Sequence, residues 1–388
     1  MKVLHIITGL NVGGAENMLA KLIEAASPDI SQEVVSLLEP GPLAERISAR
    51  NVRVHSVGMK RGLPTPRAAF ELTKIVRSVR PDVLHGWMYH GNLAASFARR
   101  MAAGNARLLW NVRHSLADPK SETRMTQALL WLSARISGAP DAIIYNSQAA
   151  LDQHSKHGFS ASRALVLPNG FDCDKFRPDP QARKKLEEIF GIEPSRLVVG
   201  CIARQHPMKD HANLIEAVSL ARRSGLDIHL LMVGAGMKPP PDDLAARISE
   251  LLPPDRVTTA EARFDVSDWL AGLDVLAVPS AWGEGFPNVI GEALCSGVPV
   301  IATDVGDSRI IVGDAGETVC ARDPEAFAEA LRRILSGSRE DRAALGTQGR
   351  RRMIERYSLP SITGEYEKLY RSISDTPAAS ASLTAAAI

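Results

Sequence analysis

Short apolar runs rich in β-branched residues alternate with longer stretches of helical periodicity along almost the whole chain. In the first half, the candidate strands are residues 3–7, 33–37, 52–56, 83–85, 108–112, 142–145 and 165–167, and the clearest helical patterns are residues 15–26 and 67–80. Strands that are separated by helices predict a parallel sheet with helices on both faces. Several of the runs are apolar throughout, as strands that are buried on both faces must be.

The same pattern starts again in the second half. Its candidate strands are residues 197–202, 228–233, 275–278, 299–302 and 318–320, and its candidate helices are residues 212–223, 244–251, 288–295 and 324–335. Each series is long enough for one doubly wound domain, and 388 residues are enough for two such domains. The expected fold class is therefore α/β, with two Rossmann-like domains and an active site in the cleft between them.

A polar, turn-rich segment at residues 168–194 marks the junction between the two series. We place the N-terminal domain at residues 1–172 and the C-terminal domain at residues 173–360. A further helical segment follows at residues 361–376. The alanine- and serine-rich tail, residues 377–388, is expected to be disordered.

The overall charge is nearly balanced, with 46 basic and 44 acidic residues, but its distribution is uneven. Residues 1–172 carry 20 basic and 13 acidic residues, a net charge of +7. This asymmetry suits an anionic surface or substrate, and ordinary scatter of surface charges produces it equally well. The basic residues have no aromatic interleaving, which argues against nucleic-acid binding. No apolar run reaches the ~20 residues of a membrane span, and the opening run is too brief for a secretion signal, so we expect a cytoplasmic protein.

The strongest chemical signal is the segment Glu284-Gly285-Phe286-Pro287-Asn288-Val289-Ile290-Gly291-Glu292, which follows an apolar strand and opens a helix. Pro287 suits the first helical turn, where its missing N–H costs nothing. The free N–H groups around residues 286–289 then form an anion site, and Gly285 lets a ligand approach the backbone closely. Two carboxylates, Glu284 and Glu292, that flank such a site fit two polyols joined by a diphosphate, which is a nucleotide sugar. The alternative is a capped helix with two solvated glutamates.

A second candidate cluster follows the strand at residues 197–202. Arg204 stands at the carboxyl end of that strand, and Lys209 lies in the loop before the next helix. A guanidinium binds phosphate with two parallel hydrogen bonds and an ammonium acts as a point charge, so the two side chains can hold both phosphates of a diphosphate. Asp210 is expected to serve only as the N-cap of that helix. Two exposed basic residues beside a turn are the alternative.

The first half offers two further candidates. Gly13 and Gly14 lie in a loop between the opening strand and a helix, where backbone N–H groups can meet a phosphate. The loop departs from the Gly-x-Gly-x-x-Gly fingerprint, and a tight turn explains it equally well. His114, next to Arg113, ends the run that starts at residue 109 and can hydrogen-bond a sugar hydroxyl. A histidine that only satisfies local hydrogen bonds is the alternative.

Together these features resemble glycosyltransferase family 4. The resemblance is carried, in the family's order, by Gly13-Gly14-Ala15-Glu16, by Leu167-Pro168-Asn169-Gly170-Phe171-Asp172, by Arg204 with Lys209, and by Glu284 with Glu292. It covers residues 1–372 and implies a GT-B fold with a retaining mechanism. It implies an acceptor site on the N-terminal domain, a donor site on the C-terminal domain, and a final helix that returns to the N-terminal domain. Ala203, where the family often has glycine, is a departure from the pattern.

The resemblance also assigns roles by position. Glu284 would contact the donor sugar and Glu292 the ribose, Arg204 and Lys209 would hold the diphosphate, and Gly14 would face the phosphate from the opposing wall. The donor would be a nucleotide sugar, with a UDP-sugar favoured over a GDP-sugar. We expect Arg204, Lys209, Glu284 and His114 to be catalytic, and the positive groups to replace a divalent cation at the leaving diphosphate.

No metal site is expected. Asp172-Cys173-Asp174 spells the Asp-x-Asp of metal sites in the other large glycosyltransferase fold, but it falls at the domain junction and is interpreted as coincidence. His154 and His157 lack a third ligand and are expected on a solvated helix face. The four cysteines, Cys173, Cys201, Cys295 and Cys320, contain no Cys-x-x-Cys pair and are expected to be reduced.

The expected acceptor is a glycan or a lipid-diphosphate-linked glycan, as in bacterial surface polysaccharide synthesis. The helix at residues 67–80 combines four basic residues with an apolar set, which suits peripheral contact with an anionic membrane. An ordinary amphipathic helix with its basic face in water is the alternative. Two other functions fit the same features: a GT-B-fold sugar-nucleotide 2-epimerase, and a non-catalytic two-lobed sugar-binding protein.

Overall fold

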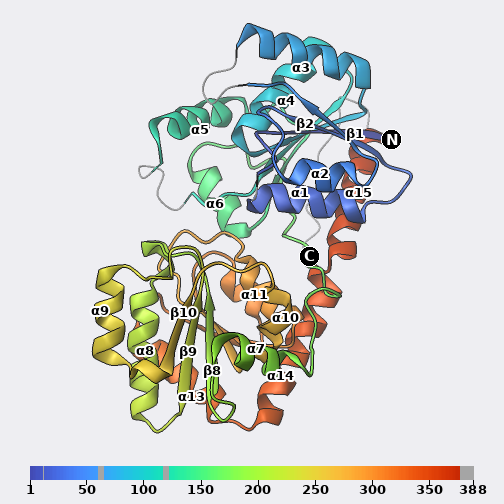
Figure 1. Ribbon diagram of the computed structural model, residues 1–388. Coiled ribbons are helices and arrows are strands. Elements are labelled where there is room, and N and C mark those ends of the chain that lie inside the picture. The colour runs from blue at the N-terminus through green and yellow to red at the C-terminus, as the bar shows by residue number, and fades with distance from the viewer. Residues whose placement is uncertain (12, 60–64, 117–121, 376–388) are drawn as a thin grey trace. The chain divides into compact units, whose positions relative to one another are not determined.

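The computed structural model describes residues 1–11, 13–59, 65–116 and 122–375. They form two compact α/β units (Figure 1). The first unit comprises Met1–Gly170 and Leu359–Ile388, and the second comprises Phe171–Ser358. The tail at residues 377–388 lies outside the described residues.

The first unit is built on one seven-stranded sheet in which every strand pair is parallel. Its strands are β1 (Lys2–Ile7), β2 (Ser31–Ser36), β3 (Arg53–Ser56), β4 (Val83–Trp87), β5 (Arg107–Val112), β6 (Ala142–Tyr145) and β7 (Ala164–Val166). Their spatial order is β3-β2-β1-β4-β5-β6-β7. The order therefore switches direction between β1 and β4, and ligands of doubly wound sheets bind at the carboxyl ends of strands at such a point.

Helices cover both faces of this sheet. α1 (Gly14–Ala25), α2 (Leu43–Ser48) and α15 (Leu359–Asp375) contribute to one core, and α3 (Pro66–Val79), α4 (Met88–Ala102), α5 (Arg124–Ile136) and α6 (Gln148–Lys156) contribute to the other. Short polar side chains start several of these helices: the hydroxyl oxygens of Thr65, Thr123 and Ser147 accept hydrogen bonds from the first turns of α3, α5 and α6.

α15 is held in the first unit by its aromatic face and by one carboxylate. The Tyr370 hydroxyl lies 2.9 Å from Nδ1 of the buried His85, and the Tyr366 hydroxyl accepts a hydrogen bond of 3.1 Å from the Asn111 amide. The Glu367 carboxylate accepts hydrogen bonds from the backbone and the hydroxyl of Ser27, each 2.7 Å long. The last helix of the chain is therefore part of the unit formed by the N-terminal residues.

The second unit repeats the plan with a six-stranded parallel sheet. Its strands are β8 (Leu197–Ile202), β9 (Ile228–Val233), β10 (Val257–Ala260), β11 (Val275–Val278), β12 (Val300–Thr303) and β13 (Gly316–Val319), in the order β10-β9-β8-β11-β12-β13. α8 (His211–Arg223), α9 (Asp242–Leu251) and α13 (Pro324–Leu335) pack on one face. α7 (Ala182–Phe190), α10 (Val266–Trp269), α11 (Asn288–Cys295) and α12 (Ser308–Val312) pack on the other, where α14 (Arg339–Arg352) lies against α11. The switch point lies between β8 and β11.

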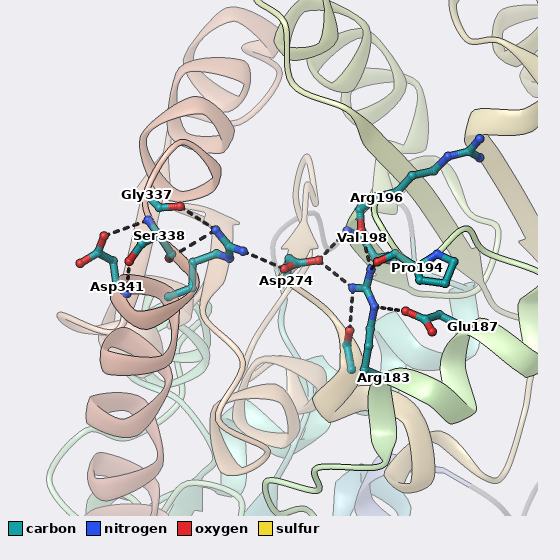
Figure 2. A network of polar contacts seen from close by, with 11 residues as sticks. Arg183, Glu187, Pro194, Arg196, Val198, Asp274, Gly337, Ser338 and Asp341 are labelled. Carbon is teal, nitrogen blue, oxygen red and sulfur yellow. Dashed lines mark hydrogen bonds and ion pairs between the residues drawn. The ribbon is translucent and has the colours of Figure 1, made fainter.

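Asp274 ties the amino end of this second sheet together (Figure 2). Its carboxylate accepts hydrogen bonds from Arg183 of α7 at 2.9 Å, from the backbone of Val198 in β8 at 2.8 Å, and from Arg342 of α14 at 3.1 Å. This network lies at the end of the sheet opposite to the carboxyl ends of the strands. It is therefore a structural element and no part of the candidate site.

The sequence pattern missed several elements for identifiable reasons. β10 is an edge strand with two threonines and no fully buried residue, so it lacks an apolar run. α4 begins directly after β4, without a turn that would separate the two elements. α5 buries only Leu130 and Ser133, so it has no apolar stripe of helical period.

Within the described residues, no helix is both long enough and apolar enough to cross a membrane.

Candidate active site

The loop that follows β8 carries the first pair of predicted site residues. Arg204 lies just beyond the end of β8 with its side chain exposed, and it forms no hydrogen bond or ion pair with any residue that the structure describes. Lys209 ends a 3-10 turn, Pro207–Lys209, that His206 caps through a hydrogen bond of 3.2 Å from the Met208 backbone. Asp210 occupies the N-cap position of α8, as expected, but its side chain makes no capping hydrogen bond.

The loop that follows β11 reaches the same place. The ammonium of Lys209 contacts the Glu284 carboxylate in a largely buried ion pair. The hydroxyl of the buried Ser280 donates a second hydrogen bond, 2.6 Å long, to the same oxygen of Glu284. The Ala281 backbone donates to the Met208 carbonyl oxygen at 2.8 Å, which joins the two loops. Two segments 75 residues apart in sequence are therefore held as one cluster.

Ser280 was missed by the sequence analysis. Its carbonyl oxygen accepts a hydrogen bond of 2.6 Å from Thr303 at the end of β12, so the neighbouring strand fixes its position. The sequence did carry a signal for Ser280, because it is a polar residue just beyond the carboxyl end of the buried strand β11. On the other side, the backbone of Asp307 donates to the Gly285 carbonyl oxygen at 2.9 Å. Gly306 lies against the Glu284 carbonyl so closely that a Cβ atom there would come within 2.3 Å of the oxygen.

α11 has the bounds that the sequence predicts, residues 288–295, but Pro287 does not lie in its first turn. Pro287 is the N-cap residue, and Asn288 is the first helical residue. The exposed Asn288, the half-buried Val289 and the half-buried Glu292 lie in the first five residues of the helix. The helix therefore begins four residues after Glu284. Its first N–H groups can serve as the anion site that the sequence predicts beside this carboxylate.

The side chain of Phe286 belongs to the core. It is buried and stacks on Phe171, with ring centroids 6.1 Å apart, and it also contacts the ring of Tyr357. Gly291 is required by this packing, because a Cβ atom would lie 2.2 Å from the Phe171 ring. Only the backbone of Phe286 is thus available for an anion, and the aromatic packing fixes the loop that presents it.

A shallow depression of about 400 Å³ lies beside these loops. Pro207, Asp210, Ala281 and Trp282 line part of it, and the Arg322 guanidinium stacks 5.3 Å from the centre of the Trp282 ring. None of the predicted site residues lines this depression. It therefore borders the Lys209–Glu284 cluster without including it.

In the first unit, Gly13 and Gly14 lie after β1 at the start of α1. Gly13 is the N-cap residue, and its carbonyl oxygen accepts hydrogen bonds from the backbone and the side chain of Asn17, at 3.0 and 2.9 Å. Gly14 is exposed, with open space where a Cβ atom would be. The Glu16 carboxylate lies against Gly13, and partial burial raises the pKa of that carboxyl. Val12 of the same loop lies outside the described residues.

His114 follows β5 in the first unit. Its Nδ1 lies 3.3 Å from the Tyr89 hydroxyl, and its Nε2 lies 3.3 Å from a carboxylate oxygen of Glu122. Burial lowers the pKa of His114, and the negative charge of Glu122 opposes that shift. The neighbouring Arg113 is a structural residue, because it donates to the Tyr366 hydroxyl at 2.8 Å and to the Asn169 side chain.

His154 does not lie on a solvated helix face, so that expectation was wrong. It is fully buried, and both of its ring nitrogens have partners: the Ala150 carbonyl oxygen and the Tyr89 hydroxyl, each 2.7 Å away. Asp172 of the Asp-x-Asp sequence accepts hydrogen bonds from the backbones of Asp174 and Lys175, which is a local turn. In the described parts of the chain, no three potential metal ligands are grouped together.

All four cysteines are free thiols. Their spacing in the sequence gave no sign that two of them are neighbours, but the sulfur atoms of Cys173 and Cys295 lie 3.3 Å apart.

Two doubly wound parallel sheets, each with a ligand-binding switch point, together with a final helix that belongs to the first unit, define the GT-B class of α/β glycosyltransferases. Two family models match the chain: Glycosyltransferase Family 4 over residues 12–175 and Glycosyl transferases group 1 over residues 196–337. The chain belongs to this glycosyltransferase family. The expected family and fold class are confirmed.

Known bacterial proteins and solved structures are similar to the chain. The lipopolysaccharide core biosynthesis mannosyltransferase LpsB of Rhizobium meliloti is 27% identical over 53% of this chain and 61% of its own length. A GDP-mannose-dependent alpha-(1-6)-phosphatidylinositol monomannoside mannosyltransferase of Mycolicibacterium smegmatis is 32% identical over 56% of this chain and 58% of its own. The crystal structure of Anabaena Alr3699/HepE in complex with UDP has a TM-score of 0.82 at 20% identity, and covers 96% of this chain and 100% of that one. The chain is thus a GT-B glycosyltransferase with relatives in bacterial polysaccharide and glycolipid synthesis.

Proposed function

We propose that this glycosyltransferase takes a nucleoside-diphosphate sugar and transfers the sugar, with retention of configuration and without a metal ion, to a glycan or lipid-linked glycan. The observation that carries the proposal is the contact between Lys209 and Glu284. It joins the carboxyl ends of β8 and β11 at the switch point of the second sheet, beside the start of α11. A cation, a carboxylate and a helix N-terminus in one place suit the diphosphate and the hydroxyls of such a donor.

The chemistry follows from where charge develops. When the glycosidic bond breaks, negative charge builds on the departing diphosphate. Lys209, the exposed Arg204 and the N–H groups at the start of α11 stabilise that charge and lower the barrier. The acceptor hydroxyl then attacks from the face that the diphosphate leaves, and the configuration at the sugar carbon is retained. Glu284 binds the sugar, and Glu292 binds the ribose.

We favour a UDP-sugar over a GDP-sugar as the donor. A solved structure with the same fold holds UDP, whereas a 32% identical relative is GDP-mannose-dependent, so the donor assay includes sugars of both nucleotides. The acceptor site lies in the first unit, where His114 stands just beyond the end of β5. Because nucleotide sugars are made in the cytoplasm, we place the enzyme on that side of the membrane.

The test of the proposed function is the release of UDP from UDP-sugars, with and without a bacterial membrane extract as acceptor. A transferase releases UDP in proportion to sugar incorporated into the acceptor. A 2-epimerase that reuses the same fold converts the donor into its epimer with or without acceptor and incorporates no sugar, and a sugar-binding protein leaves the donor unchanged. Either of those two outcomes overturns the proposal.

We also propose that the first unit contacts anionic membrane through the outer surfaces of α3, α4 and α5. Part of the expectation for α3 was wrong, because Leu72, Val76 and Val79 are buried in the core and cannot meet lipid. The surface itself supports the contact. It exposes Phe70 of α3, Met101 of α4, and Met125, Trp131 and Leu132 of α5, by 42 to 66% of each side chain's surface. Exposed basic residues accompany them, as a membrane surface requires; they are Arg67, Lys74, Arg77, Arg124 and Arg135.

Flotation with vesicles of mixed neutral and anionic phospholipid tests this contact. We expect the wild-type protein to float at low salt, and Trp131→Ser to reduce the bound fraction several-fold because an exposed indole is lost. The matched control is Phe264→Ser, which removes a 97% exposed ring from the second unit and leaves flotation unchanged. Equal flotation of the two variants, or no flotation of the wild type at low salt, contradicts the proposal.

A further inference from the structure

Three side chains, of which His114 is the outermost, form a hydrogen-bonded chain. Its innermost member is His154, which is fully buried. Nδ1 of His154 lies 2.7 Å from the Ala150 carbonyl oxygen. A carbonyl oxygen only accepts, so this nitrogen carries a proton and donates it. Burial lowers the pKa of His154 to about 4, so the ring is neutral at physiological pH and its Nε2 is a bare acceptor.

The middle member of the chain is Tyr89 of α4, the helix that follows β4. Its side chain is 95% buried, and its hydroxyl lies 2.7 Å from Nε2 of His154. Because that nitrogen can only accept, the Tyr89 O–H must donate to it. Burial raises the pKa of the phenol well above its usual value, so the proton stays on the oxygen. With its one proton used, the hydroxyl has only lone pairs left for a further partner.

That further partner is His114. Its Nδ1 lies 3.3 Å from the Tyr89 oxygen, and the contact is favourable only if Nδ1 carries a proton and donates it. The other ring nitrogen, Nε2, points to a carboxylate oxygen of Glu122 at 3.3 Å. The side chain of His114 is 34% exposed, whereas the two members behind it are buried. Of the two ring nitrogens of His114, Nε2 is thus the one that points away from Tyr89 and His154.

We propose that Tyr89, itself oriented by His154, fixes a proton on Nδ1 of His114, so that Nε2, beside Glu122, is the nitrogen that gains and loses a proton. A solvent-exposed histidine side chain prefers the opposite arrangement, with the proton on Nε2. The direction starts at one fixed end, the Ala150 carbonyl oxygen, and passes through three side chains. The Glu122 carboxylate attracts a proton to Nε2 instead, but it is 25% exposed and water can satisfy it, whereas the Tyr89 oxygen is buried and has no other donor among the described residues. Tyr89 and His154 are positioning residues.

The assignment of the proton stands on this geometry alone, but its use in catalysis rests on the proposed function. In a transferase, Nε2 of a neutral His114 accepts a hydrogen bond from the acceptor hydroxyl and takes its proton as the new glycosidic bond forms. Glu122 then stabilises the imidazolium that results. Without Tyr89, the neutral ring is free to place its proton on Nε2 towards Glu122, and it then has no lone pair for the acceptor.

The experiment is a long-range proton–nitrogen spectrum of the ¹⁵N-labelled full chain at about pH 8, where the neutral forms of histidine dominate. The signals of His114 are identified by their loss in His114→Gln. In the wild type, we expect Nδ1 to show the shift of a protonated nitrogen and Nε2 that of a bare one. In Tyr89→Phe, we expect the two nitrogens to exchange these shifts.

The matched control is Tyr145→Phe. Its hydroxyl is also buried, its ring lies 5.3 Å from the ring of His154, and the hydroxyl has no hydrogen-bond partner among the described residues. Removing it is expected to leave the His114 signals unchanged. A protonated Nε2 in the wild type overturns the proposal whether or not any variant folds, and so does a Tyr89→Phe spectrum identical to that of the wild type.

Activity separates this inference from the proposed function. We expect Tyr89→Phe to lower the kcat of acceptor-dependent UDP release about tenfold, with little change in the KM of the donor, because only the proton-transfer step is affected. Tyr145→Phe retains wild-type activity. If the nitrogen shifts are as expected and no acceptor supports UDP release, the assignment of the proton stands and the transferase proposal fails.

Discussion

Lys209→Ala is expected to lower the kcat of UDP release by about a thousandfold, because the departing diphosphate loses a preorganised positive charge in a partly buried site. The ammonium of Lys209 is 82% buried, and it meets the carboxylate of Glu284 rather than bulk water. Its charge is therefore screened much less than that of a surface lysine. Arg204→Ala is also expected to lower kcat strongly, because the Arg204 guanidinium has no partner among the described residues and can give two parallel hydrogen bonds to the diphosphate.

The control for this prediction is Lys184→Ala. Lys184 also faces a glutamate, Glu188, at 3.8 Å, but both side chains are mostly exposed. Its loss is expected to leave kcat unchanged and to alter the free energy of unfolding by less than about 0.5 kcal/mol. Urea unfolding of Lys209→Ala checks that the variant is folded, because removing the lysine leaves Glu284 with Ser280 alone as its charge-stabilising partner. Near-normal turnover in both Lys209→Ala and Arg204→Ala refutes the proposed role of these residues.

The first unit is expected to lose stability in mild acid because of His5. This residue is fully buried in β1, where its Nδ1 accepts a hydrogen bond of 3.1 Å from the Trp87 indole and its Nε2 lies 2.8 Å from the Gln32 amide oxygen. A second proton would go to Nδ1, where the indole N–H already points. Burial lowers the pKa of His5 from 6.5 to about 4.

The sign of the effect follows from proton binding. Between pH 6.5 and about 4, the unfolded chain binds a proton on His5 and the folded chain does not, so the stability present at neutral pH is lost as the pH falls through this window. The loss from His5 is about 2 kcal/mol by pH 5 and about 3 kcal/mol by pH 4, and it levels off at about 3.4 kcal/mol below that. Six other histidines have pKa values lowered by burial and add to the slope of the wild type; they are His85, His90, His114, His154, His211 and His229.

Urea unfolding at a series of pH values measures this effect. The variant His5→Gln removes the titrating group, so its free energy of unfolding should fall less steeply with acid than that of the wild type. His157→Gln replaces an exposed histidine and should retain the full wild-type slope. If the free energy of unfolding falls equally steeply with acid in the wild type and in His5→Gln, the proposed effect of the buried His5 on stability is wrong.

The fold was predictable where the pattern of burial was simple. β8 and β11 are apolar from end to end, β9 is interrupted only by His229, and the sequence placed all three at the residues where the structure has them. Elements with little buried surface, such as β10 and α5, leave no such pattern. The loops of the second unit were identified because glycine, proline and charged residues stand directly after predicted strands.

What the sequence could not show is which side chains meet across those loops. Lys209 and Glu284 are each visible as charged loop residues, but their contact depends on the switch point between β8 and β11. For His154 the sequence predicted the wrong environment, because a histidine near the end of a short polar helix is expected to be exposed to solvent. Its burial is set by Tyr89, Tyr145 and Phe159, which lie on other elements of the same unit.

The central claim is that side chains and backbone groups of the second unit neutralise the departing diphosphate in place of a metal ion. The most direct test is the acceptor-dependent release of UDP after the enzyme and all reagents have been treated with EDTA, and again after Mg²⁺ or Mn²⁺ has been added back. The account predicts the same kcat in both conditions, together with the thousandfold loss in Lys209→Ala. Activity that disappears in EDTA and returns only with the metal ion would contradict it.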